Sequence, residues 1–265
     1  MMFLKKILIC IFVAVAIFIV CVIATPVDKG VIILEYHMIN DNAKGDEKRY
    51  SVTPTEFREQ LAYLKANGYE TVSMRDFMLA KKGKSTLPEK PIVLTFDDGY
   101  KDNYCNMLPI LEEFAMKATV YVVTNDIGKD DYLSYDELKE MQSRGVELGS
   151  HTANHLPLTS LSREKQIEEI KLSKLMLEWN GLDTIYTFSY PNGAYDENLP
   201  QILKENEYLT AVTGEAGVNT FNTDPYLLHR VHIVNPTFGL YEFRYRLLKA
   251  EIYNKLGIFN REIKK

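Results

Sequence analysis

Cysteine and tryptophan are scarce in this 265-residue chain, which contains three cysteines and one tryptophan. Cys10 and Cys21 lie in an apolar N-terminal stretch, so Cys105 is alone in the remainder of the chain. One cysteine cannot form an intramolecular disulfide, which excludes the small secreted folds that depend on a disulfide framework. Because 46% of the residues are hydrophobic, the chain can instead bury a sizeable core of its own.

An excess of positive charge is also absent, since 31 lysines and arginines face 36 acidic residues and the net charge is -5. Phosphate backbones are bound mainly through lysine and arginine, so this acidic balance argues against a nucleic-acid partner. The sequence shows no internal repeat and no low-complexity stretch beyond its N-terminal run. The simplest organisation is therefore one domain over residues 30–265.

Charged residues are missing from positions 7–24, an apolar run that follows Lys5 and Lys6. Two lysines before such a run fit an export signal, and small residues near its end form an acceptable cleavage site. Its length is also close to that of a membrane-spanning helix. Residues 1–25 therefore predict a signal-anchor, which we favour, or a cleaved signal peptide. Either one implies that the remaining chain lies outside the cell membrane, tethered to it or secreted.

Apolar, β-branched runs recur along the rest of the chain, and helical patterns separate most of them. Thr53, Pro54 and Glu56 predict a helix start, because Thr53 and Glu56 can form a capping box and proline suits the first helical position. Ser134 predicts a second helix in the same way. Alternating strands and helices indicate a parallel sheet, and seven strands favour an α/β fold that is a closed or nearly closed β/α barrel, with functional groups at the strand C-terminal ends. The seven runs are residues 31–37, 91–96, 118–124, 146–150, 185–190, 208–213 and 227–234.

Two adjacent carboxylates, Asp97 and Asp98, follow one of these runs and precede Gly99, which permits a sharp turn. Adjacent side chains point to opposite faces within a strand, but both can reach one pocket where a strand ends in a turn. One interpretation is an Asp-Gly turn with a capping aspartate. The other is a pair of functional carboxylates, and the pair alone leaves both open.

Two histidines, His151 and His155, follow another run with a spacing of four residues. This spacing brings both imidazoles to one face if the stretch forms a helical turn, as in many metal sites, although two polar loop histidines would fit as well. Together with one carboxylate they make a three-ligand set that leaves a coordination position open, as in catalytic zinc sites. The second aspartate could then accept a proton from water that attacks a carbonyl.

The stretches TFDDGY and SHTANH resemble the first two motifs of the polysaccharide deacetylases, carbohydrate esterase family 4, which share the NodB-homology domain. The resemblance runs from about residue 31 to 235 and includes FSYPNGAYD and LLHRVHIV. It implies a distorted (β/α) barrel of the NodB type with Asp97 as the catalytic base. It also implies a divalent ion, with Zn2+ preferred, held by Asp98, His151 and His155.

The third motif of that family normally has an arginine that orients the basic aspartate, and here Ser189 occupies that position. Arg230 could supply a guanidinium from a neighbouring strand end, although an arginine there could equally form a surface ion pair. The family pattern keeps Pro191 and implies the backbone N–H of Asn192 as an oxyanion donor, while Asn192 also fits a plain turn. Tyr190, beside the motif, could line a glycan groove.

The YPxG form of this motif and the early dipeptide YH are similar to the branch of the family that acts on poly-N-acetylglucosamine. In that branch the histidine that protonates the leaving amine comes from the early YH, which is His37 here. Elsewhere in the family it comes from a late motif resembling the run that contains His229 and His232. His37 would share a barrel rim with Asp97 and His151. We expect His37 to be the general acid, with His232 and His229 as alternatives.

These residues suggest a metal-dependent N-deacetylase that releases acetate from N-acetylglucosamine units of a cell-surface polysaccharide. Poly-N-acetylglucosamine, peptidoglycan and chitin-like chains all remain candidate substrates. One alternative is a glycan-binding protein that keeps the fold without turnover, and another is a metal hydrolase acting on small amides or esters. Intact aspartates and histidines in the first two motifs favour an enzyme over a binding protein.

Overall fold

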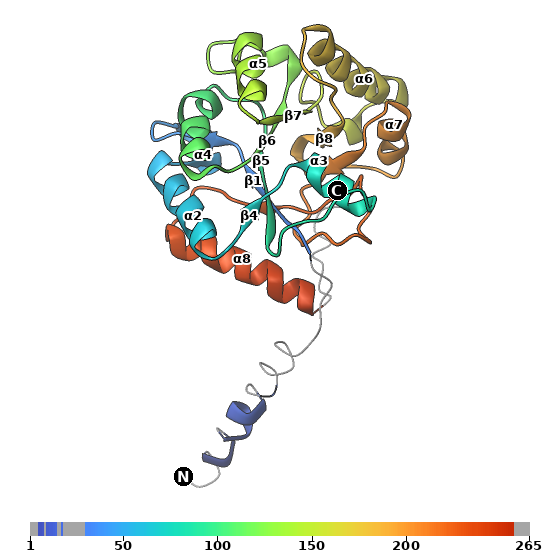
Figure 1. Ribbon diagram of the computed structural model, residues 1–265. Coiled ribbons are helices and arrows are strands. Elements are labelled where there is room, and N and C mark those ends of the chain that lie inside the picture. The colour runs from blue at the N-terminus through green and yellow to red at the C-terminus, as the bar shows by residue number, and fades with distance from the viewer. Residues whose placement is uncertain (1–4, 8, 15–16, 18–29, 257–265) are drawn as a thin grey trace.

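The computed structural model describes residues 5–7, 9–14, 17 and 30–256. At its centre, a curled sheet of parallel strands is surrounded by helices (Figure 1). The strands follow the order β10-β1-β5-β6-β7-β8-β9, and β4 pairs with the beginning of β5. They comprise β1 Ile32–Tyr36, β4 Glu70–Thr71, β5 Pro91–Phe96, β6 Thr119–Val122, β7 Glu147–Ser150, β8 Thr187–Ser189, β9 Thr210–Val212 and β10 Val231–His232.

Helices connect most successive strands, and all of them except α3, which packs against the inside of the curl, surround the sheet (Figure 1). They are α2 Pro54–Ala66, α3 Met74–Lys81, α4 Leu108–Phe114, α5 Tyr135–Ser143, α6 Arg163–Trp179, α7 Leu199–Glu205 and α8 Leu240–Lys255. Short helical turns occur at η1 Gly45–Tyr50, η2 Asn103–Met107, η3 Thr124–Asp126, η4 Leu158–Ser160 and η5 Pro191–Gly193. A separate pair of short parallel strands consists of β2 Met38–Ile39 and β3 Ser51–Val52.

All seven predicted runs contain a strand of the central sheet, and every pairing in that sheet is parallel. The predicted β/α architecture is therefore confirmed. A continuous ladder does not join the two edges of the sheet. Instead, a parallel bridge between Val212 and Leu228 joins β9 to the segment before β10, so the barrel is nearly closed. The segment that approaches β9 thus continues directly into the strand that pairs with β1.

The signal or anchor predicted over residues 1–25 lies mostly outside the described residues. Within the part of the chain that the structure describes, no helix combines the length and the apolar character needed to cross a membrane.

The sheet packs against two hydrophobic cores because successive side chains of a strand point to opposite faces. One face of the sheet packs against the surrounding helices. On the other face, Ile33, Val93 and Tyr121 fill the inside of the curl together with Met74 and Phe77 of α3. Closer to the carboxyl ends of β1 and β5, charged and polar residues replace these apolar ones. A rigid apolar base therefore supports a polar site at the strand ends.

Local capping sets the start of α2 and α5 where the sequence predicts them. Thr53 Oγ1 accepts a hydrogen bond from the Glu56 backbone N–H at 3.2 Å, and Glu56 Oε2 accepts one from the Thr53 backbone N–H at 3.1 Å. Ser134 and Glu137 make the same reciprocal pair at α5. Both predicted capping boxes are confirmed, and each satisfies backbone donors that a helix start leaves without partners.

Replacing Thr53 with alanine should lower the free energy of unfolding by about 1 kcal/mol, because the first turn of α2 loses its side-chain acceptor. Urea unfolding followed by circular dichroism would measure the change. Thr55→Ala provides the control, since Thr55 is exposed in the same turn and does not cap the helix. Equal stability of the two variants would contradict the assigned role of Thr53.

Candidate active site

Asp97 and Asp98 reach the same imidazole although they are adjacent in the chain. The Asp97 backbone N–H extends the ladder by donating to Tyr36 O at 2.9 Å, and the chain then turns with φ values of 75° at Asp98 and 78° at Gly99. His151 Nε2 lies 3.8 Å from Asp97 Oδ2 and 3.5 Å from Asp98 Oδ1. This left-handed turn lets two consecutive carboxylates serve one site.

His151 and His155 meet through a tight turn and not through the helical turn that their spacing suggested. His151 follows β7, and its backbone N–H donates to Val122 O at 2.9 Å. Thr152 and His155 have φ values of 69° and 54°, and Thr152 Oγ1 accepts a hydrogen bond from the His155 backbone N–H at 2.9 Å. The two imidazole rings are 4.7 Å apart, and each Nε2 lies 3.5 Å from Asp98 Oδ1.

Asp98, His151 and His155 fit the requirements of a divalent metal ion. Their ligand atoms all lie within 4.8 Å of one another. His151 Nδ1 lies 2.8 Å from the Ser189 carbonyl oxygen, to which it donates, so its Nε2 keeps a lone pair for a metal. Ligands of a tetrahedral zinc ion at 2.0–2.1 Å are separated by about 3.3 Å. The separation of 3.5 Å between Asp98 Oδ1 and each Nε2 is close to this value.

Asp97 is buried and firmly held by two side chains. Arg230 Nη1 and Nη2 donate to Asp97 Oδ1 and Oδ2, each at 2.8 Å, and Ser189 Oγ donates to Oδ2 at 3.0 Å. Burial raises the pKa of Asp97, but the charges of Arg230 and His151, together with the hydrogen bonds from Arg230, outweigh burial and hold this pKa well below its usual range. Asp97 is therefore an oriented carboxylate anion. The guanidinium comes from Arg230, on the segment entering β10, while Ser189 occupies the position of the family arginine.

His37 follows β1 and stands beside Asp97. Ligand atoms of Glu35, His37 and Asp97 lie within 4.8 Å of one another. The His37 ring packs at 5.1 Å from the ring of Tyr50, and Asn103 Nδ2 donates to the His37 carbonyl oxygen at 2.9 Å. Among the described residues, the buried Nδ1 of His37 has no hydrogen-bond partner. A buried ring nitrogen without a hydrogen-bond partner can form a hydrogen bond with a group of the substrate.

His232 and His229 have different surroundings. His232 Nδ1 lies 2.8 Å from Glu35 Oε1, and its Nε2 lies 2.8 Å from the Gly214 carbonyl oxygen. Burial lowers the pKa of His232, but the hydrogen bond to Glu35, the charge of Glu35 and the contact with Gly214 together outweigh burial and raise it overall. His229 Nδ1 lies 3.6 Å from Glu215 Oε2, and burial lowers the pKa of His229. Both nitrogens of His232 are therefore engaged with acceptors of the protein itself.

The structure corrects the position expected for Tyr190. This side chain is fully buried, its ring lies 5.4 Å from that of Phe188, and its hydroxyl donates to Tyr226 O at 3.1 Å. Tyr190 therefore belongs to the core and does not line an open groove. Pro191 is also buried, whereas Asn192 is exposed in the turn after β8 with a φ of 57°.

Glu35 is a site residue that the sequence analysis missed. Its carboxylate is buried and lies 2.8 Å from Arg230 Nε and 2.8 Å from His232 Nδ1. The available signal was an acidic residue inside the otherwise apolar run VIILEY. A charge in such a run is rarely buried without a partner, so it indicates an ion pair inside the sheet.

Comparisons with known proteins agree with this geometry. Residues 84–211 match the family described as Polysaccharide deacetylase. One relative is YxkH of Bacillus subtilis (strain 168), whose name describes it as a polysaccharide deacetylase. It is 33% identical over 201 residues, which are 76% of this chain and 70% of YxkH. A poly-beta-1,6-N-acetyl-D-glucosamine N-deacetylase of Staphylococcus aureus (strain MSSA476) is 27% identical over 205 residues, covering 72% of this chain and 70% of that enzyme.

A solved structure resembles the whole described domain. The Streptococcus pyogenes deacetylase PplD in complex with acetate matches with a TM-score of 0.75 and 29% sequence identity, over 84% of this chain and 99% of PplD. Fold, motif order and sequence identity therefore agree, and the chain belongs to the polysaccharide deacetylase family of hydrolases.

Proposed function

We propose that this enzyme is a metal-dependent N-deacetylase that hydrolyses acetamido groups of N-acetylglucosamine units in a cell-surface polysaccharide. The observation that carries the proposal is the buried, ionised Asp97 beside the three metal-ligand candidates Asp98, His151 and His155. This arrangement gives one carboxylate to the metal and leaves the other for proton transfer.

A divalent ion at this site would acidify a water molecule and polarise the acetyl carbonyl. Asp97 accepts the proton of the attacking water, and Arg230 and Ser189 hold its carboxylate in a single orientation during this transfer. The amide nitrogen is a poor leaving group and needs a proton as the C–N bond breaks. His37 donates this proton, the products being acetate and a free amine. The backbone N–H of Asn192 stabilises the oxyanion that forms in between.

A carbohydrate substrate is supported by an aromatic pair next to the candidate metal site. Tyr100 follows the Asp98-Gly99 turn, and its ring stacks on that of Tyr132 with centroids 5.2 Å apart. Both rings are partly exposed and could pack against the apolar face of a sugar. The Staphylococcus aureus relative acts on poly-beta-1,6-N-acetyl-D-glucosamine, according to its name, so this polymer is our first candidate.

Acetate release from a panel of glycans tests the proposal. Poly-N-acetylglucosamine, peptidoglycan fragments and chitin oligomers would each be incubated with the protein in the presence of zinc and, separately, of a chelator. We expect zinc-dependent acetate release from at least one polymer. Binding without acetate release would favour the glycan-binding alternative, and release from acetylated small amides or esters alone would favour the small-molecule hydrolase.

Substituting His151 with alanine should remove most of the bound divalent ion and most of the activity together, because the site loses one of three ligands. Metal content by mass spectrometry and acetate release would be measured on the same sample. His229→Ala is the matched control, since His229 lies beside Glu215 and outside this ligand set. Full metal occupancy in His151→Ala would refute the ligand assignment.

A further inference from the structure

Four charged side chains form a continuous chain behind the proposed catalytic base, and three of them are buried. Asp97 is paired with Arg230, Arg230 Nε lies 2.8 Å from Glu35 Oε2, and Glu35 Oε1 lies 2.8 Å from His232 Nδ1. Asp97, Arg230 and Glu35 are 2%, 1% and 6% exposed. The ordered alternation of two anions and two cations links Asp97 to His232 of β10, the register partner of Glu35 on β1.

The orientation of Asp97 depends on how the Arg230 guanidinium is held. The guanidinium is planar, so its Nη1 and Nη2 atoms move together with Nε. Both Nη atoms bind Asp97 in a two-pronged contact. The Nε–H donates to the Thr213 carbonyl oxygen at 3.1 Å, and Nε lies 2.8 Å from Glu35 Oε2 in an ion pair that is not a hydrogen bond. Glu35 and Thr213 therefore hold the edge of the plane that does not touch Asp97. Rotation of this edge would turn the two-pronged contact away from the carboxylate.

A second buried acid next to Arg230 needs a second cation, since one guanidinium balances only one carboxylate. His232 supplies it, because both of its ring nitrogens face acceptors and the imidazole is stabilised as a cation. Attraction to Arg230 and His232 outweighs the effect of burial and lowers the pKa of Glu35. Glu35 is thus held as an anion between two cations.

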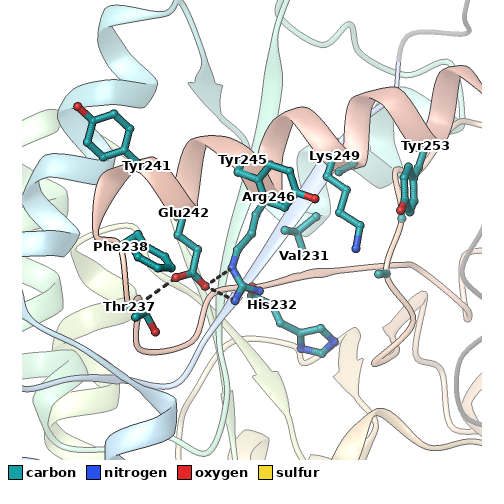
Figure 2. Close-up of a pocket in the computed structure, with 13 residues that line it drawn as sticks. Val231, His232, Thr237, Phe238, Tyr241, Glu242, Tyr245, Arg246, Lys249 and Tyr253 are labelled. Carbon is teal, nitrogen blue, oxygen red and sulfur yellow. Dashed lines mark hydrogen bonds and ion pairs between the residues drawn. The ribbon is translucent and has the colours of Figure 1, made fainter. Parts of the chain in front are cut away.

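His232 also lines a groove beneath α8, as Figure 2 shows. The groove has a volume of about 780 Å³, and Arg246 and Lys249 of α8 contribute further positive charge. Glu242, the acidic residue in its lining, is bonded to Arg246 through two contacts of 3.2 and 2.6 Å. The residues of the groove therefore do not neutralise the His232 imidazolium. The charge partner of His232 is Glu35.

We propose that Glu35, kept in place by His232, is a positioning residue that orients the Arg230 guanidinium and through it the Asp97 carboxylate. The inference rests on the proposed function, in which Asp97 accepts a proton. Glu35 itself touches neither the substrate nor the reacting atoms. Burying three charged side chains is costly compared with apolar packing, and control of the base gives this row of charges a function.

Glu35→Gln tests the proposal because glutamine has the same shape and no charge. We expect kcat to fall by about 10- to 100-fold, since a displacement of about 1 Å at a catalytic group is enough for such a loss. KM and zinc content should stay within about twofold of the wild type, because the metal ligands and the residues proposed to contact the substrate are not altered. The crystal structure of Glu35→Gln should show Arg230 rotated and one of its two contacts with Asp97 lost.

His232→Gln and the double variant, which combines it with Glu35→Gln, test whether His232 acts through Glu35. His232→Gln should lower kcat less than Glu35→Gln does, because Glu35 keeps its contact with Arg230. The double variant should be no slower than Glu35→Gln alone, since His232 acts only through Glu35. Glu215→Gln is the matched control, as Glu215 lies beside the other late histidine and should leave kcat unchanged.

An unchanged kcat in Glu35→Gln, or an unchanged Arg230–Asp97 contact in its crystal structure, would overturn the proposal. Losses that multiply in the double variant would show that His232 and Glu35 act independently, and would overturn the order proposed here. If the wild type releases no acetate from any glycan, the proposed function fails. The crystal structure of Glu35→Gln then still decides whether Glu35 positions Arg230.

Discussion

Replacing Asp97 with asparagine is expected to lower kcat by about 10²- to 10⁴-fold, the usual contribution of a positioned proton acceptor. Asparagine has nearly the same shape but cannot accept the proton of the attacking water. Its amide group would also face an Arg230 nitrogen that now donates to a carboxylate oxygen at 2.8 Å. Acetate release under substrate saturation would give kcat, and mass spectrometry would give the zinc content of the same protein.

In this experiment the zinc content distinguishes the role of Asp97 from that of Asp98. Asp97→Asn should keep its zinc because Asp98, His151 and His155 remain, whereas Asp98→Asn should lose zinc and activity together. Asp126→Asn removes a partly exposed carboxylate paired with Lys129 and serves as the charge-matched control. A near-normal kcat in Asp97→Asn would exclude Asp97 as the base.

Much of the fold could be predicted because its signals are local. The run PIVLTF becomes a strand with all six residues buried, as expected for a central parallel strand covered on both faces. Thr53 and Ser134 begin helices through contacts three residues away. The strands β2, β3 and β4 were not predicted, because each has two residues and depends on a neighbouring strand for its pairing.

The candidate site was predictable where its residues follow strand ends and unpredictable where distant segments meet. The strand ends after β5 and β7 bring Asp98 and His151 together, as their positions suggested. The contact between Arg230 and Asp97 spans 133 positions, so the sequence offered it as only one of two interpretations of Arg230, beside a surface ion pair, and the structure decides for it. Tyr190 shows the reverse case, because it neighbours Ser189 in the chain and yet faces the core, as alternation along a strand requires.

The largest effect outside the metal ligands and Asp97 is expected for His37→Ala. The leaving amine must be protonated, and loss of a positioned general acid typically costs about 10²- to 10⁴-fold in kcat. His37 has a buried Nδ1 without a partner among the described residues and lies next to Asp97. His232 instead gives both ring nitrogens to Glu35 and Gly214. The geometry thus favours His37 as the donor.

The pH profile of kcat/KM distinguishes the two histidines. A general acid must carry its proton, so activity declines on the alkaline side as that proton is lost, and removing the acid should abolish this decline. We expect His37→Ala to lose the alkaline limb while zinc stays bound. His232→Gln should keep the limb, since His232 acts on Glu35 and not on the substrate. If His232→Gln abolishes the limb and His37→Ala retains it, the proton comes from the late histidine and the assignment to His37 is wrong.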